Sequence, residues 1–263
     1  MNTIHFIDGE KGGTGKSWVA RLMHHHFRVK QVPFLGVDAD RSNPTYHNIY
    51  NDTQLLSFSI HPNEADYADA LYSMALESSL LVNLPAQSHR ALEQWLITKG
   101  VLDLLERKQI AVRKWWVSDG EGDSLNLLIN SLESMGERVP HTLICNHGRC
   151  SDWSFFHAHR PVQEAIRQYK VAIVDLPEMS NFRRAQVNDR KFTFEQAIQN
   201  QDGVLTDIGA MVVERYCHDT LPVFEAGGAF GQPSEAALTI ANTKLAETAT
   251  AKSTAKSSTK KSA

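Results

Sequence analysis

Apolar residues occur along this chain in short runs, and between the runs they recur every three or four positions. Short apolar runs are typical of buried strands, whereas the wider spacing is typical of helices that cover a sheet. This alternation predicts an α/β fold with a mainly parallel sheet and helices on both faces, a three-layer sandwich. The predicted strands are Thr3–Asp8, Val32–Asp38, Leu80–Leu84, Ala111–Ser118, His141–Asn146 and Val171–Leu176.

The C-terminal part of the chain contains two kinds of sequence. From Phe194 to Phe224, apolar residues follow helical spacing, so helices are expected there. Order is expected to fade after Gly227, and Thr248–Ala263 contains only Ala, Ser, Thr and Lys. Such a segment cannot offset its ordering entropy by burying apolar surface. We predict one domain at 1–226 and a low-complexity, lysine-containing disordered tail at 227–263.

Composition narrows the class of protein. The 263 residues carry a formal net charge of -3, which gives no global attraction to DNA or to an acidic membrane. No apolar run approaches the roughly 20 residues of a membrane helix, so no transmembrane segment is expected, and the N-terminus lacks a signal sequence. Three cysteines are too few, and odd in number, for a disulfide framework. A cytoplasmic protein is expected.

A glycine-rich segment, Lys11-Gly12-Gly13-Thr14-Gly15-Lys16-Ser17, joins the first strand to the first predicted helix. Glycines let main-chain N–H groups approach an anion, and a helix N-terminus favours negative charge. Lys16 is placed to contact β- and γ-phosphates, and the Ser17 hydroxyl can complete the coordination of Mg²⁺. A surface turn is the alternative, but the flanking strand and helix favour binding of ATP and Mg²⁺. The predicted nucleotide-binding residues in this loop are Gly12, Gly13, Thr14, Gly15, Lys16 and Ser17.

Two carboxylates follow the second predicted strand, at Asp38 and Asp40. Hydrolysis of a triphosphate needs a water held in line with the γ-phosphate and a metal that neutralises developing charge. Carboxylates at a strand end that faces the phosphate loop can serve both needs. An acidic turn that only caps a loop is the alternative interpretation.

The loop departs from the standard phosphate-loop pattern, because Glu10 stands where that pattern has glycine and Lys11 follows it. In this it resembles the deviant Walker A motif of the ParA/MinD group of P-loop NTPases. The resemblance implies an ATP-bound homodimer in which Lys11 reaches the partner's nucleotide. Asp38 and Asp40 resemble the first switch of these ATPases, which implies that Asp40 orients the water and Asp38 supports the metal. The implied catalytic residues are Lys11, Lys16 and Asp40.

The strand that ends Val82-Asn83-Leu84-Pro85 resembles the Walker B strand of this group, with Asn83 where the group has an aspartate. Asparagine can hydrogen-bond a metal-bound water but brings no charge, so slow hydrolysis is expected. Asp175 lies in a second Walker B-like strand but comes late in the chain, and Asn83 is therefore preferred. The predicted metal set is Ser17, Asp38 and Asn83.

Three further signals are weaker. Asn146 resembles the asparagine that reads the nucleotide base in these ATPases, although capping of a loop is equally consistent. The run His24–His26 on the first predicted helix has no evident carboxylate or cysteine partner, which favours a solvated helix surface. Trp115 and Trp116 are expected to pack against flanking helices.

Within this group, the chain resembles the plasmid conjugal-transfer and stability ATPases of the TraL/StbB/MobD type. The first strand with its loop, the turn Val117–Gly120 and the segment Lys191–Ile198 carry that likeness. It implies a slow, partner-stimulated ATP hydrolase that acts as a nucleotide-dependent dimerisation switch in plasmid mobilisation, conjugal transfer or partition. An adaptor or DNA-processing protein is the implied partner.

The tail and the alternatives complete the hypothesis. Four tail lysines would add non-specific attraction to DNA, although a merely solubilising tail is equally consistent; they are Lys252, Lys256, Lys260 and Lys261. One alternative function is an ATP-binding regulatory module with little or no hydrolysis, suggested by Asn83. Another is a metabolic ATP-dependent ligase or kinase of the same superfamily, against which the sequence offers no separate substrate domain.

Overall fold

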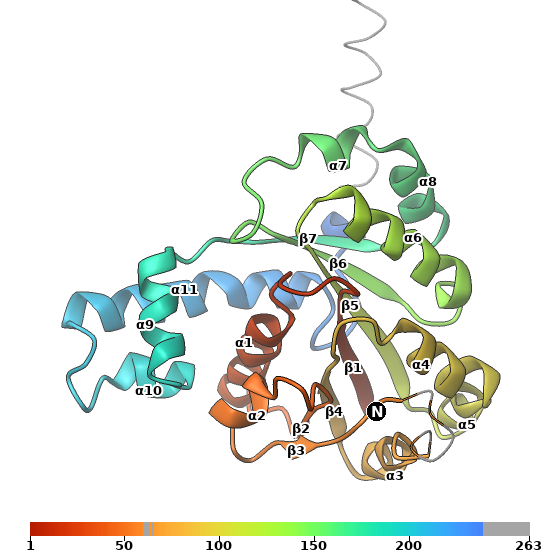
Figure 1. The fold of residues 1–263 in the computed structure, drawn as a ribbon, viewed down its shortest axis with the longest axis horizontal. Helices are drawn as coiled ribbons and strands as arrows, with labels where there is room; N and C mark the ends of the chain where they lie inside the picture. Colours follow the sequence, from red (N-terminus) through yellow and green to blue (C-terminus); the bar gives the residue numbers. More distant parts are fainter. Residues whose placement is uncertain (60, 62–63, 65, 239–263) are drawn as a thin grey trace, which may run out of the picture.

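The strands form one parallel sheet. The computed structural model describes residues 1–59, 61, 64 and 66–238. Within them, seven strands follow the order β3-β2-β4-β1-β5-β6-β7, and every neighbouring pair is parallel (Figure 1). The predicted α/β fold with a mainly parallel sheet is thus confirmed. The strands are β1 (Thr3–Asp8), β2 (Phe34–Asp38), β3 (Gln54–Leu55), β4 (Ser79–Asn83), β5 (Ala111–Ser118), β6 (His141–Asn146) and β7 (Ala172–Leu176).

Helices cover both faces of this sheet (Figure 1). On one face α1, α2, α10 and α11 contribute to one apolar core, and on the other the cores are completed by α3, α5, α6 and α8. The described helices are α1 (Lys16–Val29), α2 (Thr45–Ile49), α3 (Asp69–Glu77), α4 (His89–Glu93), the π-helical turn η1 (Gln94–Thr98), α5 (Val101–Arg107), α6 (Gly122–Met135), α7 (Ser154–Ala158), α8 (Arg160–Gln168), α9 (Asn181–Asp189), α10 (Phe194–Gln199) and α11 (Asp207–Ala226).

The central strand β1 explains why the strand sequences are so apolar. It lies between β4 and β5, so both of its edges are paired, and the two apolar cores cover its two faces. Ile4 and Phe6 point into the core beneath α3 and α5, whereas Ile7 points into the core beneath α1. Parallel strands end at the same edge of the sheet, so the loops after β1, β2, β4 and β6 converge there.

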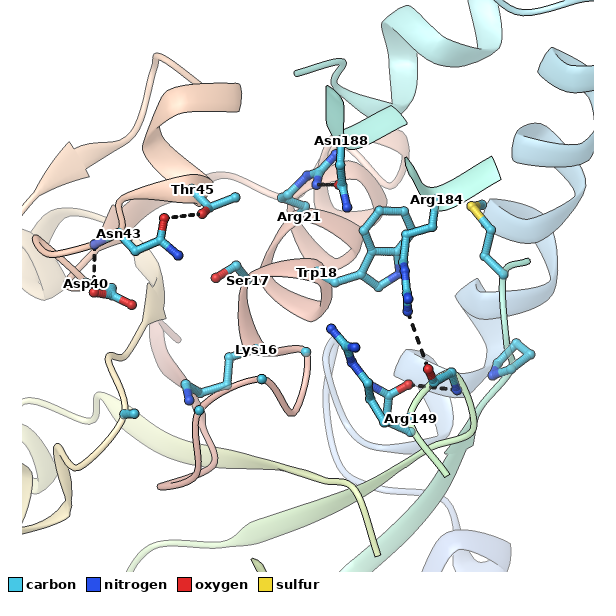
Figure 2. Close-up of a pocket in the computed structure, with 18 of the residues that line it drawn as sticks. Lys16, Ser17, Trp18, Arg21, Asp40, Asn43, Thr45, Arg149, Arg184 and Asn188 are labelled. Carbon is cyan, nitrogen blue, oxygen red and sulfur yellow. Dashed lines mark hydrogen bonds between the residues drawn. The ribbon is translucent and has the colours of Figure 1, made fainter. Parts of the chain in front are cut away.

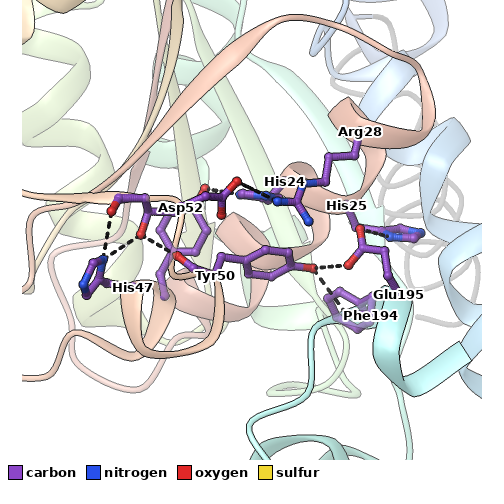
Figure 3. Close-up of polar contacts among 10 residues, drawn as sticks. His24, His25, Arg28, His47, Tyr50, Asp52, Phe194 and Glu195 are labelled. Carbon is purple, nitrogen blue, oxygen red and sulfur yellow. Dashed lines mark hydrogen bonds and ion pairs between the residues drawn. The ribbon is translucent and has the colours of Figure 1, made fainter. Parts of the chain in front are cut away.

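The first helix is more deeply buried than its sequence predicts. His24, His25 and His26 are 1%, 6% and 1% exposed, so the prediction of a solvated surface is wrong. The reason is that α2, α10 and α11 pack around α1 and supply polar partners, among them Glu195 beside His25 (Figure 3). The rings bond Tyr46 Oη at 2.8 Å, Glu195 Oε1 at 2.8 Å and Thr220 Oγ1 at 3.0 Å, respectively. Trp115 and Trp116 are fully buried on opposite faces of the sheet.

The packed part of the chain continues past the predicted domain boundary. Helix α11 ends at Ala226, but Ala229 and Ala237 are only 5% and 2% exposed, and Phe230 packs against Phe27. Residues 227–238 therefore do not belong to a disordered tail, because their small and apolar side chains fit against the α1 core. The four tail lysines at 252, 256, 260 and 261 lie outside the described residues. Within the part of the chain that the structure describes, no helix is long and apolar enough to cross a membrane.

Candidate functional site

The glycine-rich segment forms a loop between β1 and α1 at the carboxyl edge of the sheet. Gly15 is the N-cap of α1 and adopts φ of 106°, in the left-handed region, so it leaves the first N–H groups of the helix without a side-chain cap. A Cβ added at Gly15 would lie 2.5 Å from Asn146 Nδ2. At Gly12 and Gly13, by contrast, an added Cβ would meet no atom within 4 Å. The loop therefore presents bare main chain to an open space.

Lys16 folds back over this loop. Its Nζ donates hydrogen bonds to the carbonyl oxygens of Gly9 at 2.7 Å and Lys11 at 3.0 Å, and the side chain lines the cavity. Burial lowers the pKa of Lys16, while the charges of Asp8 and Asp40 oppose that shift. The ammonium group is thus held at the loop and can be stabilised further by an anion.

Beside Lys16, the structure brings Ser17, Asp38 and Asn83 together. Asn83 Nδ2 donates to Asp38 Oδ1 at 2.9 Å and lies 3.4 Å from Ser17 Oγ. The other oxygen of Asp38 accepts from the His47 N–H at 3.0 Å, and burial raises the pKa of Asp38. Asn83 Oδ1 is buried and has no hydrogen-bond partner among the described residues. An orphaned amide oxygen beside a hydroxyl and a carboxylate fits a hydrated Mg²⁺, which prefers oxygen donors.

Asp40 lies at the rim of the same site and is half-buried. Its Oδ1 accepts hydrogen bonds from Ser42 Oγ at 2.7 Å and from the Asn43 N–H at 3.1 Å. The loop-capping interactions are therefore present, and they fix the carboxylate facing the cavity. No group of three or more His, Cys, Asp or Glu side chains suited to a metal occurs in the residues described.

A cavity of about 440 Å³ is lined by Lys16, Ser17 and Asp40 together with residues of other elements (Figure 2). Its size lies within the range of small-molecule sites. Four cationic side chains and a single carboxylate line it, so the cavity favours an anionic ligand. The lining residues include Gly12, Gly13, Gly15, Lys16, Ser17, Trp18, Arg21, Asp40, Asn43, Thr45, Asn146, Arg149, Pro177, Met179, Arg184, Asn188 and Tyr216.

Three of these cations, Arg21, Arg149 and Arg184, were not predicted from the sequence. They come from α1, from the turn after β6 and from α9, so only the fold brings them together. The one sequence signal available is that Arg149 closely follows Asn146 at a strand end, where ligand-binding loops of parallel sheets lie.

Asn146 connects two walls of the cavity. Its Nδ2 donates to the Thr14 carbonyl at 2.7 Å, and its Oδ1 accepts from the Gly148 N–H at 3.1 Å. The side chain therefore has the loop-capping contacts, and contact with a nucleotide base stays a prediction. Thr14 is buried, so its contribution to the site is made through the main chain.

Lys11 points away from the cavity. Its Nζ lies 3.0 Å from Asp119 Oδ2 and also pairs with Glu121, both in the turn after β5. Hydrogen bonds to Glu121 and Asp119 raise the pKa of Lys11 above its usual range. Lys11 would have to leave these carboxylates to reach a second subunit.

The competing Walker B-like aspartate lies elsewhere. Asp175 is 53% exposed and pairs with His147 Nε2 at 2.8 Å, and it does not line the cavity. Asp175 lies on β7, three strands away from β1 in the sheet, which keeps it apart from Ser17. Asn83, on the strand next to β1, is therefore the better placed of the two.

Comparison with known proteins was made by sequence and by structure. No protein-family model matches the chain. In sequence it is similar to Protein MobD of Acidithiobacillus ferrooxidans, with 22% identity over 202 residues, which cover 75% of this chain and 87% of MobD. This similarity agrees with the resemblance to MobD-type proteins that the sequence indicates.

Solved structures with a similar arrangement were also found. A nucleotide-binding protein of Archaeoglobus fulgidus in complex with ADP has a TM-score of 0.45 at 16% identity and covers 72% of this chain and 86% of its own. The MinC:MinD cell division complex of Aquifex aeolicus has a TM-score of 0.43 at 14% identity, covering 84% and 96%. The ATP complex of Cyanothece McdA has a TM-score of 0.41 at 14% identity, covering 89% and 99%.

Proposed function

We propose that this chain binds Mg-ATP, hydrolyses it slowly and uses the nucleotide to control its association with a second copy. One observation carries the proposal. A bare glycine loop with Lys16 opens into a cationic cavity that Ser17 also lines, and the buried Asp38 and Asn83 side chains lie behind Ser17. Main-chain N–H groups, a lysine and oxygen donors for a metal are the groups that a triphosphate requires.

Each residue has a distinct part in the proposal. The amides from Gly13 to Ser17 and the Lys16 ammonium hold the phosphates. Ser17, with Asp38 and Asn83 behind it, would hold Mg²⁺, which neutralises phosphate charge when bound. Asp40 faces the cavity from the rim and orients the attacking water. Because Asn83 brings no charge to the metal side, hydrolysis is slow.

Association with a second copy is proposed through Lys11. Its position at the start of the loop, outside the cavity, suits a contact to a neighbouring nucleotide once its ion pairs to Asp119 and Glu121 are released. The similarity to MobD supports a role in plasmid mobilisation, conjugal transfer or partition in the cytoplasm, with an adaptor or DNA-processing protein as partner. The tail lysines would add non-specific contact with DNA.

A second candidate is an ATP-binding regulatory module that does not turn ATP over. The observation in its favour is the amide of Asn83, which leaves Asp38 as the one carboxylate of the metal cluster. Prolonged incubation of the purified protein with ATP and Mg²⁺ distinguishes the two. Release of phosphate that Asp40→Asn abolishes supports hydrolysis, whereas no release, even with DNA present, supports the regulatory module.

The binding experiment comes first. Lys16→Ala should weaken ATP binding by about 100-fold or more, because it removes the charge that contacts the phosphates. Titration with a fluorescent ATP analogue measures this, and Lys108→Ala, an exposed lysine outside the cavity, is the matched control. Absence of ATP binding by the unmodified protein in the presence of Mg²⁺ would end the proposal.

The dimerisation experiment follows. Lys11→Ala should leave ATP affinity nearly unchanged but abolish ATP-dependent dimers, as measured by light scattering after size-exclusion chromatography with Asp40→Asn in the background to prevent hydrolysis. Persistence of the dimer would contradict the role given to Lys11 while leaving nucleotide binding intact.

A further inference from the structure

The four cations that line the cavity differ in how far their binding capacity is already used. Arg21 donates to Asn188 Oδ1 at 2.7 Å and to the Phe192 carbonyl at 3.0 Å, and its guanidinium lies 5.0 Å from the centre of the Trp18 ring. Lys16 is bonded to its own loop. Arg184 also makes two hydrogen bonds. Among the residues described, Arg149 is the lining cation whose side chain makes no hydrogen bond or ion pair.

The main chain that carries Arg149 is nevertheless fixed. The N–H groups of Arg149 and Cys150 both donate to the Asn146 carbonyl, at 2.9 and 3.1 Å, which closes a tight turn after β6. The Asn146 side chain ties this turn to Thr14 of the phosphate loop. Arg149 therefore begins from a position that is set relative to the phosphate loop.

Arg184 braces the same turn from α9. Its Nη1 donates to the Gly148 carbonyl at 3.4 Å (Figure 2). Its Nη2 donates to Asn181 Oδ1 at 2.6 Å. The guanidinium thus lies against the residue that precedes Arg149. Arg184 is occupied by these contacts, and it adds a second positive charge beside the first.

The Arg149 side chain is directed inward. Figure 2 shows it extending from the turn toward the space between Lys16 and Trp18. Burial, and then the like charge of Arg184, lower the pKa of Arg149, whereas Asp119 opposes the shift. Two guanidinium groups that line the same cavity and repel each other are stabilised when an anion enters it.

We propose that Arg149 binds phosphate oxygens of the nucleotide held by the same chain, and that Arg184 positions it. This inference rests on the proposed function, because it adds a contact to the same ligand. The planar guanidinium can donate two parallel hydrogen bonds to a phosphate, and no competing acceptor has to be displaced. Arg149 thus acts as a cationic contact supplied in cis, from a turn outside the phosphate loop.

Affinity measurements test the contact. Arg149→Ala should raise the Kd for ATP about tenfold or more. Arg149→Lys keeps the positive charge but not the planar guanidinium, so its Kd should lie between those of the unmodified protein and Arg149→Ala. Because the contact is to phosphate, the same loss is expected for inorganic tripolyphosphate, measured by competition with a fluorescent ATP analogue. Arg160→Ala is the matched control, since its side chain is 87% exposed and lies outside the cavity.

A double-mutant cycle tests the role of Arg184. If Arg184 acts through Arg149, Arg184→Ala should weaken ATP binding by less than Arg149→Ala, and the double variant should bind no worse than Arg149→Ala alone. Additive losses would show that Arg184 contacts the ligand independently and would overturn the positioning role. Melting temperatures check that each variant is folded, which is expected for Arg149→Ala because the Arg149 side chain makes no hydrogen bond or ion pair with the described residues.

The outcomes separate this inference from the proposed function. If the unmodified protein binds ATP and Lys16→Ala does not, but Arg149→Ala binds both ATP and tripolyphosphate within twofold of the unmodified protein, the Arg149 contact is wrong and the proposed function stands. If Arg149→Ala weakens ATP but not tripolyphosphate, Arg149 contacts the nucleoside and the phosphate contact is overturned. If the unmodified protein binds no nucleotide, the proposed function fails first.

Discussion

At its first turn, α1 places Lys16 and Ser17 beside an open cavity, whereas its later turns place His24, His25 and His26 inside the protein. Ser17 Oγ has a single long contact, 3.4 Å from Asn83 Nδ2, within the described residues. Each of the three histidine rings, by contrast, has a close polar partner on another helix or loop. One helix therefore carries polar groups that face an open cavity at one end and bond to neighbouring elements at the other, although the buried Nε2 of His24 has no hydrogen-bond partner among the described residues.

The end of α1 that bears the histidines holds neighbouring elements around the helix. His24 lies 3.9 Å from the Tyr50 ring, centre to centre, and bonds Tyr46, so it fixes α2 and the turn that follows it. Glu195 accepts from both Tyr50 and His25, which adds α10 (Figure 3). A run of polar residues on a helix is therefore a candidate ligand site where the side chains face an open cavity, and a packing element where they bond to neighbouring helices.

Acid should destabilise the fold through its buried histidines, including His24 and His26 of α1. Burial lowers the pKa of His24 to about 4 and that of His26 to about 3, below the value of about 6.5 in an unfolded chain. Between the folded and the unfolded pKa, the unfolded chain binds more protons than the folded chain. The free energy of unfolding therefore falls as pH falls from about 6.5 toward 4, by up to about 1.4 kcal/mol per pH unit for each histidine. His5 and His141, with a pKa lowered by burial to about 3, act in the same direction. Urea unfolding at pH 7.5 and 5 should therefore differ by several kcal/mol.

The variant His26→Leu measures how much of this pH dependence of the free energy of unfolding comes from His26. His26→Leu keeps Thr220 bonded to the Cys217 carbonyl and should flatten the dependence by about 1.4 kcal/mol per pH unit in the same window. Glu195 contributes at lower pH: burial alone would raise its pKa, but the His25 hydrogen bond lowers it to about 2, so that its stabilisation is lost as pH falls from about 4.5 toward 2. A slope that is unchanged in His26→Leu would contradict the assignment.

Truncation of the central histidine should destabilise the fold without emptying the site. His24→Ala removes a buried ring and its bond to Tyr46, at a cost of about 2–4 kcal/mol in the free energy of unfolding. Nucleotide affinity of the folded fraction should stay within about twofold. Chemical denaturation and nucleotide titration measure the two effects, and His218→Ala, 85% exposed, should cost less than about 0.5 kcal/mol. If His24→Ala lost as much nucleotide affinity as Lys16→Ala, the division of α1 into a binding end and a packing end would be contradicted.

A negative charge added beside Asp38 should have a smaller effect on stability, and that effect should depend on Mg²⁺. Asn83→Asp places a second carboxylate within hydrogen-bonding distance of Asp38, which should destabilise the protein by about 1–2 kcal/mol without divalent cations. Mg²⁺ with ATP should recover that loss, because the cation neutralises the pair. Thermal unfolding with and without Mg-ATP measures this. Equal stability of both proteins in the presence of chelator would contradict the charge argument.

The sequence was sufficient for the fold because its signals are local. The apolar runs and the glycine loop specify parallel strands and a phosphate-loop helix, and both are present. The histidines were placed wrongly because the elements that bury them, such as α10 and α11, lie far along the chain, and helical spacing within α1 does not reveal them. The two-residue strand β3 was too short to give a pattern.

For the candidate site, proximity was predictable only in part. The carboxyl ends of β2 and β4 lie side by side, so the meeting of Asp38 and Asn83 follows from strand order. Arg149 and Arg184 reach the cavity through a turn after β6 and a helix after β7, and nothing in their local sequence marks that convergence. The functions given to all the site residues remain predictions, and for Lys11, Asp40 and Asn146 intramolecular partners account for the contacts observed.

The central position of β1 in the sheet affects how the protein folds during its synthesis. β1 is the first strand to be synthesised, yet its neighbours β4 and β5 are formed by residues 79–83 and 111–118. A nascent chain therefore exposes its first strand on the ribosome until β5 has emerged. Before then, no neighbouring strand holds β1 and the loop that follows it in place. Nucleotide bound during translation would report that the centre of the sheet has closed, and would favour that closed state by mass action.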